Sequence, residues 1–260
     1  MENLDSLERT FSDALLSGRF TYSTVVTHLG NRTNQYGEPR VIEATLISQM
    51  AEEIVSFVKG GDKHVARGIA LGIVLGNPTY ENMGEEFLKE KIPGYKKSGL
   101  GVALTAVMLN ELCGKRIDRI LKGVEDALDG KEDISEEAKA AEIACRIYNA
   151  ANKRNDRDMF NSVSTMAFGK VIRATGKNGT VTSVDYIDKI DEKESEKDLI
   201  VRTPKQKEEL ENAYDYYCKN YSEIPEEFTS ALDGYSTESI VAYYVASMRE
   251  LALMKLYSAR

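Results

Sequence analysis

The stretch VARGIALGIVLG, residues 65–76, decides the fold, because apolar residues occupy almost every face of the helix that it would form. A helix that is apolar all round is typical of one surrounded by other helices. The stretch ends at Gly76-Asn77-Pro78, and a glycine closely followed by a proline is a common helix stop. The sequence therefore predicts a buried central helix over residues 65–76.

Segments on both sides of this stretch carry apolar residues at helical spacing. Residues 41–58 place apolar side chains from Leu46 to Val58 along one stripe, which predicts an amphipathic helix. Further helices are expected over residues 100–113, 116–127, 135–153, 204–221 and 237–257. Ser135 stands where the N-cap of one of them would be. We therefore predict an all-α fold, a bundle of helices.

One region departs from the helical pattern. VIRAT and TVTSV flank the turn-like GKNG within residues 170–190, which predicts a small β-hairpin. Residues 188–198 (DKIDEKESEKD) are too charged to bury and are expected to form an exposed loop or linker. We expect a single domain over residues 1–260, with residue 195 as the one candidate for a minor boundary.

Composition excludes several classes of protein. The 260 residues carry 42 acidic and 34 basic side chains, a formal net charge of −8, which opposes nonspecific binding to nucleic acid or to an anionic membrane. No apolar run approaches the roughly 18–20 residues of a membrane span, and the first residues lack the order of a signal peptide. The odd set Cys113, Cys145 and Cys218 makes no disulfide framework. We expect a cytoplasmic protein.

Other residues that attract attention have ordinary structural interpretations. The glycines of residues 57–63 (FVKGGDK) and 70–76 lack the Lys-Ser/Thr pair and the preceding strand of a phosphate-binding loop. His28 and His64 are the only histidines, so a mechanism that needs a histidine cluster is excluded. His64 is expected in a solvated loop between helices. Cys145 stands among small and apolar residues and is expected to be a buried thiol rather than a nucleophile.

Four segments occur in an informative order: RVIEATLISQMAEEI (40–54), ALGIVLGNPTYENMGEE (70–86), ACRIYNAANKRND (144–156) and YYVASMRELALMKLY (243–257). Together they resemble the signatures of the HD superfamily, specifically the deoxyguanosine-triphosphate triphosphohydrolase (dNTP triphosphohydrolase) family. Arg40 keeps the leading arginine of the first signature, and Tyr80 stands for the aromatic residue of the second, whose frame is kept by Gly76, Pro78, Gly84 and Glu85. The resemblance implies an HD-domain-like helical bundle.

The resemblance also implies that the chemistry of the family is lost. In the family a divalent metal is held by one His of the first signature, a His-Asp pair of the second and an Asp of the third. These places fall on Glu43, Ile73, Val74 and Cys145. Ile73 and Val74 have no lone pair to donate, and two further family histidines fall on Asn77 and Asn82, which cannot transfer protons near neutral pH. We therefore expect no catalytic residue, no metal and no cofactor.

A binding cleft is what the resemblance leaves in place. Six candidate ligands of a phosphate lie in segments that line the substrate cleft of the family, namely Arg40, Tyr80, Lys96, Lys97, Arg146 and Lys153. Cations among them can hold phosphates without a metal. We expect a catalytically inactive relative that binds a dNTP or another phosphorylated ligand, or that binds protein. The family implies a homo-oligomer, or association with an active relative.

Two alternatives stay open on the sequence. The chain could be an active phosphohydrolase whose metal is held by another set, Glu43, Glu81, Glu85 and Asp156. It could also be a module that binds protein or single-stranded DNA through the cations at residues 153–157. The net charge of −8 favours a protein partner over nucleic acid.

Overall fold

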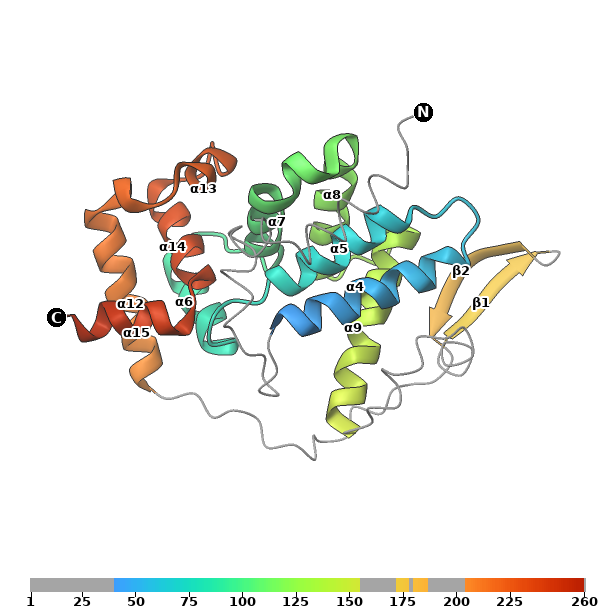
Figure 1. Cartoon of the computed structure of the whole chain (residues 1–260), viewed down its shortest axis with the longest axis horizontal. Coiled ribbons are helices and arrows are strands. Elements are labelled where there is room, and N and C mark those ends of the chain that lie inside the picture. Colours follow the sequence, from blue (N-terminus) through green and yellow to red (C-terminus); the bar gives the residue numbers. More distant parts are fainter. Residues whose placement is uncertain (1–39, 155–171, 178–179, 187–203, 260) are drawn as a thin grey trace.

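The computed structural model describes residues 40–154, 172–177, 180–186 and 204–259, and the chain is mainly helical over these ranges (Figure 1). One group of helices comprises α4 (Arg40–Ser56), α5 (Lys63–Leu75), α7 (Ser98–Cys113), α8 (Ile117–Leu128) and α9 (Glu136–Arg154). A second group comprises α6 (Asn82–Lys91), α12 (Pro204–Lys219), α13 (Glu226–Ala231), α14 (Thr237–Ser247) and α15 (Glu250–Ser258). The groups meet where α13 and α14 contact α7. None of the described helices has both the length and the apolar character needed to cross a membrane.

Helix α5 is the centre of the first group, as predicted. It contacts α4, α7, α8 and α9, and its residues are buried except at a few positions. A glycine at residue 72 lets the neighbouring helices come close. A Cβ atom on Gly72 would lie 2.4 Å from Val124 Cγ2 and 2.5 Å from Thr105 Oγ1, so no larger residue fits without movement of α8 or α7.

The start of α5 is fixed by Asp62, whose carboxylate accepts the N–H groups of His64 and Val65. Burial alone would raise the pKa of Asp62, but hydrogen bonds and the charge of Arg116, 2.9 Å away, hold that pKa below its usual value. The helix therefore begins at Lys63 rather than at residue 65. His64 lies half-buried in its first turn, not in a solvated loop as the sequence had predicted.

The predicted hairpin is present. Strands β1 (Ile172–Lys177) and β2 (Thr180–Tyr186) pair antiparallel, with a register irregularity between Thr175 and Gly176. Strand β2 contacts α9 (Figure 1). The charged run at 188–198 and the candidate boundary at residue 195 lie outside the described residues.

The single helix predicted over residues 237–257 is wrong, because the structure divides this segment into α14 and α15. Met248 and Arg249 are extended between them, with ψ values of 154° and 142°. Thr79 donates hydrogen bonds to two carbonyl groups that, in a continuous helix, would accept backbone N–H groups of the next turn. Its N–H donates to Ala246 O at 2.7 Å and its hydroxyl donates to Met248 O at 2.5 Å. A residue 169 positions away in the sequence thus ends the helix.

We predict that Thr79→Val lowers the free energy of unfolding by about 1–2 kcal/mol, because the buried Met248 carbonyl loses its hydroxyl donor while the volume stays nearly constant. Urea denaturation measures the change. Thr229→Val is the matched control, since the Thr229 hydroxyl makes an exposed hydrogen bond within α13. Equal losses in the two variants would contradict the role given to Thr79.

Candidate functional site

The four positions at which the HD-like resemblance expects metal ligands lie on three helices that pack against one another, α4, α5 and α9. Glu43 is on α4, Ile73 and Val74 end α5, and Cys145 is in the middle of α9. Glu43 is only 7% exposed. Its negative charge acts on the thiol of Cys145 across the contact between α4 and α9.

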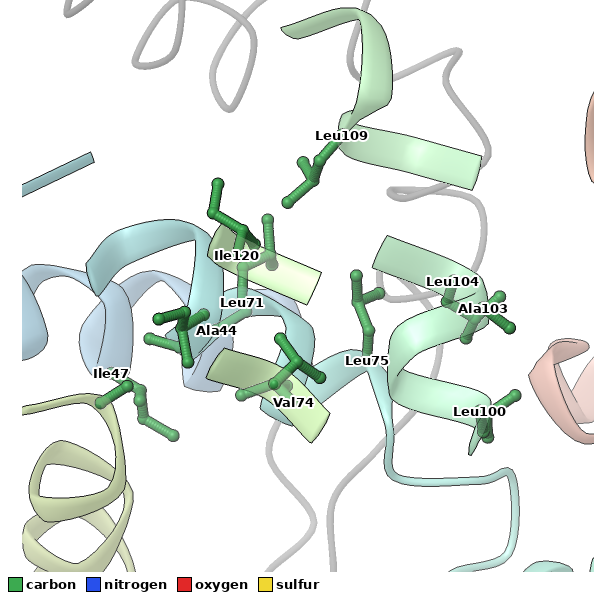
Figure 2. Close-up of a cluster of buried hydrophobic side chains, with 14 of the residues drawn as sticks. Ala44, Ile47, Leu71, Val74, Leu75, Leu100, Ala103, Leu104, Leu109 and Ile120 are labelled. Atoms are coloured by element: carbon green, nitrogen blue, oxygen red, sulfur yellow. The ribbon is translucent and has the colours of Figure 1, made fainter. Parts of the chain in front are cut away.

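The α5 side of this site is apolar. Val74 is 1% exposed and belongs to the main hydrophobic cluster, and Ile73 packs against that cluster. Figure 2 shows Val74 among labelled apolar side chains, with Ala44 of α4 and Leu75 close by. Side chains of this kind offer no lone pair to a metal ion. This part of the site is hydrophobic core.

The α4 side is occupied by Arg40, one of the largest fully buried side chains of the described chain. Its guanidinium donates to Glu43 Oε2 at 3.2 Å and also to Glu81, which lies 41 residues further along the chain. Its Nε has no hydrogen-bond partner within the described ranges. Carboxylates beside a buried guanidinium offset the cost of removing its charge from water. Glu43 is therefore an ion-pair partner rather than an uncommitted ligand.

Glu81 is brought to Arg40 by a strained turn. Tyr80 and Glu81 have positive φ values of 63° and 52°. A positive φ destabilises a residue other than glycine by about 1–3 kcal/mol. Gly84 must be a glycine for the turn to close, because its Cβ would lie 2.1 Å from Thr79 O. Strain of this kind persists only where the surroundings hold it, and it concentrates at functional sites.

Tyr80 is one of the contacts that hold the turn. Its hydroxyl donates to Glu209 Oε2 at 2.5 Å, and both residues are 2% exposed. Glu209 lies on α12, where Lys205 Nζ is 3.9 Å from its other carboxylate oxygen. The turn before α6 is thereby tied to α4 through Glu81 and to α12 through Tyr80.

The α9 side of the site presents a thiol of low reactivity. Cys145 is partly buried against the core. Burial, and then the carboxylates of Glu43 and Glu142, raise the pKa of Cys145 far above its usual value. Because the thiolate is the form that binds metals and attacks electrophiles, this thiol is suited to packing. The prediction of an unreactive thiol agrees with this environment.

The alternative carboxylate site is not assembled by the residues that the structure describes. Glu43 and Glu81 share Arg40, and Glu85 pairs with Lys89 at 2.8 Å. The fourth member, Asp156, lies outside the described ranges. Within those ranges, no three His, Cys, Asp or Glu side chains form a group that could hold a metal ion.

The six candidate phosphate ligands have different surroundings. Arg40 and Tyr80 are buried, and both donate hydrogen bonds to carboxylates. Lys96 is 68% exposed and its Nζ is 3.6 Å from Glu125 on α8. Arg146 is 62% exposed and donates to Glu142 on its own helix at 2.6 Å.

The other candidates are exposed or lie where side chains are not described. Lys97 is exposed just before α7, and Lys153 is in the last turns of α9, in a part whose side chains are outside the described set. Asn77 is half-buried after α5, while Asn82 is exposed at the start of α6. A shared phosphate cleft among these residues stays a prediction.

Sequence reasoning missed the role of Glu209 and the pairing of Glu81 with Arg40. Glu209 is 129 residues from Tyr80 and belongs to a helix rich in acidic residues, so nothing local marks it. Glu81 appeared only as a possible metal ligand. The one available signal was Arg40, because a basic residue at the start of an apolar helix has to find a counter-charge.

Comparison with known proteins leaves the family open. A scan against models of known protein families finds no match to this chain, and a search of curated proteins finds no matching relative. The HD-like resemblance is therefore a hypothesis that depends on the residues themselves.

We predict that Arg40→Met lowers the free energy of unfolding by about 3–5 kcal/mol, because it removes the positive charge that Arg40 supplies to the buried Glu43. The double variant Arg40→Met/Glu43→Gln should recover part of this loss. Arg146→Met is the control, since its exposed pair with Glu142 contributes at most about 1 kcal/mol. Urea denaturation at neutral pH compares the three variants, and similar small losses in all of them would refute the buried pair.

A second prediction concerns the cysteines. At about pH 8, iodoacetamide should alkylate Cys145 more than about tenfold more slowly than the exposed Cys218, because the raised pKa and partial burial of Cys145 suppress its thiolate. Peptide mass spectrometry measures both rates in one sample. In denaturant the two rates should converge. Fast labelling of Cys145 in the folded protein would show that the thiol is activated.

Proposed function

We propose that this chain is a catalytically inactive, HD-domain-like relative of the dNTP triphosphohydrolases that acts by binding. The single observation that carries the proposal is the pairing of Glu43 with the buried Arg40. Of the four ligand positions implied by the resemblance, two are aliphatic, one is neutralised by Arg40, and one is a thiol whose raised pKa keeps it protonated. Such a set lacks the three or more basic ligands with free lone pairs that a catalytic metal needs.

Local charge favours a protein partner over a nucleotide at this site. Arg40, Glu43 and Glu81 together carry one positive and two negative formal charges, and the next polar link leads to the carboxylate of Glu209. A triphosphate would have to displace buried carboxylates from Arg40, which is costly. A phosphorylated ligand held by the exposed Lys97 or by Lys153 is the weaker version of the proposal.

Association with a second copy or with an active relative is the kind of binding that we favour. Leu251 and Met254 on α15 are 53% and 44% exposed, and they are three residues apart, so they share a helix face. Apolar side chains placed together on a surface are what a protein partner covers. Light scattering at micromolar concentration tests self-association, and a monomer would remove that part of the proposal. Binding to single-stranded DNA stays a prediction that the overall charge disfavours.

The decisive test of inactivity is a hydrolysis assay. Purified protein is incubated with each of the four dNTPs and with manganese or magnesium, and the products tripolyphosphate and nucleoside are measured. We expect no turnover, because no metal-bound nucleophile can form. Turnover that is lost in Glu43→Gln and kept in the exposed-site control Glu132→Gln would overturn the proposal. It would identify a metal site that uses Glu43.

A further inference from the structure

A second feature of the molecule is a pocket of about 320 Å³ where the two groups of helices meet. It lies between the segment that joins α6 to α7, the helix α8, and the start of α14. Its walls combine aromatic rings, aliphatic side chains, one lysine and one glutamate. Its volume is at the small end of the range for sites that hold small molecules. The residues of the Arg40 cluster do not line it.

Tyr243 places a hydroxyl in the wall of this pocket. The residue is 3% exposed, it lines the pocket, and its hydroxyl makes no hydrogen bond within the described part of the chain. Gly99, also in the wall, gives that hydroxyl its space, because a Cβ there would lie 2.2 Å from it. A tyrosine hydroxyl in the wall of a pocket can exchange hydrogen bonds with water for one to a ligand. The Tyr243 hydroxyl is therefore available to a group that enters the pocket.

The charges in the wall are balanced and incompletely paired. Lys96 Nζ is 3.6 Å from Glu125 Oε1, too far for a good hydrogen bond, and Lys131 is still further from the same carboxylate at 3.9 Å. Both Lys96 and Glu125 can accept a new partner at little cost, because water reaches them. One cation beside one anion does not suit a polyphosphate. It suits a ligand that carries one negative and one positive group.

The remaining walls select an aromatic ring. Tyr235 is 45% exposed and meets Tyr243 edge to face, with ring centroids 5.8 Å apart. Burial is the main reason that the pKa of Tyr95 is raised, and the Tyr243 hydroxyl adds to that shift. Burial and the neighbouring Tyr235 raise the pKa of Tyr243 to about 12. Both hydroxyls are therefore neutral donors at physiological pH. Rings of this kind pack against a flat ligand and also attract an ammonium group.

We propose that this pocket binds a zwitterionic aromatic compound of amino-acid size. The carboxylate of the ligand pairs with Lys96, its ammonium group pairs with Glu125, and its ring lies against the tyrosines. The Tyr243 hydroxyl hydrogen-bonds to a polar edge of that ring. This site is independent of the proposed inactivity, because it shares no residue with the Arg40 cluster.

The probe is L-tryptophan, because the chain contains no Trp and the fluorescence of the ligand can be excited where tyrosine does not absorb. Titration with the full-length protein should give saturable changes in the intensity and anisotropy of the ligand. Lys96→Ala and Glu125→Gln should each weaken binding by about tenfold, since each removes one charge-assisted contact. Lys89→Ala, which changes an exposed lysine of α6 that does not line the pocket, should bind like the wild type. Circular dichroism confirms that each variant is folded.

Ligands that lack one charged group complete the test. Tryptamine has no carboxylate, so it should bind the wild type about as weakly as L-tryptophan binds Lys96→Ala. Indole-3-propionate has no ammonium group, so it should bind the wild type about as weakly as L-tryptophan binds Glu125→Gln. Tyr243→Phe should also lower the affinity for L-tryptophan. The proposal is overturned if L-tryptophan shows no saturable binding, if indole or adenosine binds as tightly, or if Lys96→Ala and Glu125→Gln leave the affinity unchanged. The dNTP assay reads out a different site, so either proposal can fail without the other.

Discussion

The ion pair between Arg40 and the carboxylates of Glu43 and Glu81 is the interaction on which much of the described architecture depends. A guanidinium that is 2% exposed requires charged acceptors, and one of them is held on a turn with φ values that only strong support can maintain. The same turn carries the Thr79 contacts that end α14 and the Tyr80 contact to α12. Polar contacts around one short segment thus join both groups of helices.

This interaction also determines which chemistry the site can support. Glu43 is the carboxylate whose charge acts most strongly on the thiol of Cys145, and it forms an ion pair with Arg40. With Val74 in the hydrophobic cluster, the junction of α4, α5 and α9 is stabilised by packing and by charge pairing. A catalytic metal centre needs the opposite properties, namely open coordination positions and basic ligands. The structure and the proposed loss of catalysis therefore have one physical explanation.

Local sequence patterns predicted most helices within a few residues, because helical spacing of apolar side chains reports the face that will be buried. They failed where a distant residue intervened. The apolar stripe of residues 237–257 continues across Met248, but the hydrogen bonds from Thr79 interrupt the helix there. Helix α6 escaped prediction, since its sequence NMGEEFLKEK is largely polar and buries only Gly84, Phe87 and Leu88. Its position depends on the preceding turn, whose geometry is not encoded by spacing.

By itself the sequence determined the helical class, the central place of α5, the hairpin, and the absence of lone pairs at Ile73 and Val74. These properties follow from side-chain chemistry and from the spacing of residues along the chain, so the sequence pattern alone could predict them. Only the tertiary structure decided which charges meet. The partnership of Arg40 with Glu81, that of Tyr80 with Glu209, and the pocket beside Tyr243 join residues far apart in the sequence. Whether a glutamate is a ligand or a counter-ion depends on the charge beside it, and folding brings that charge into place.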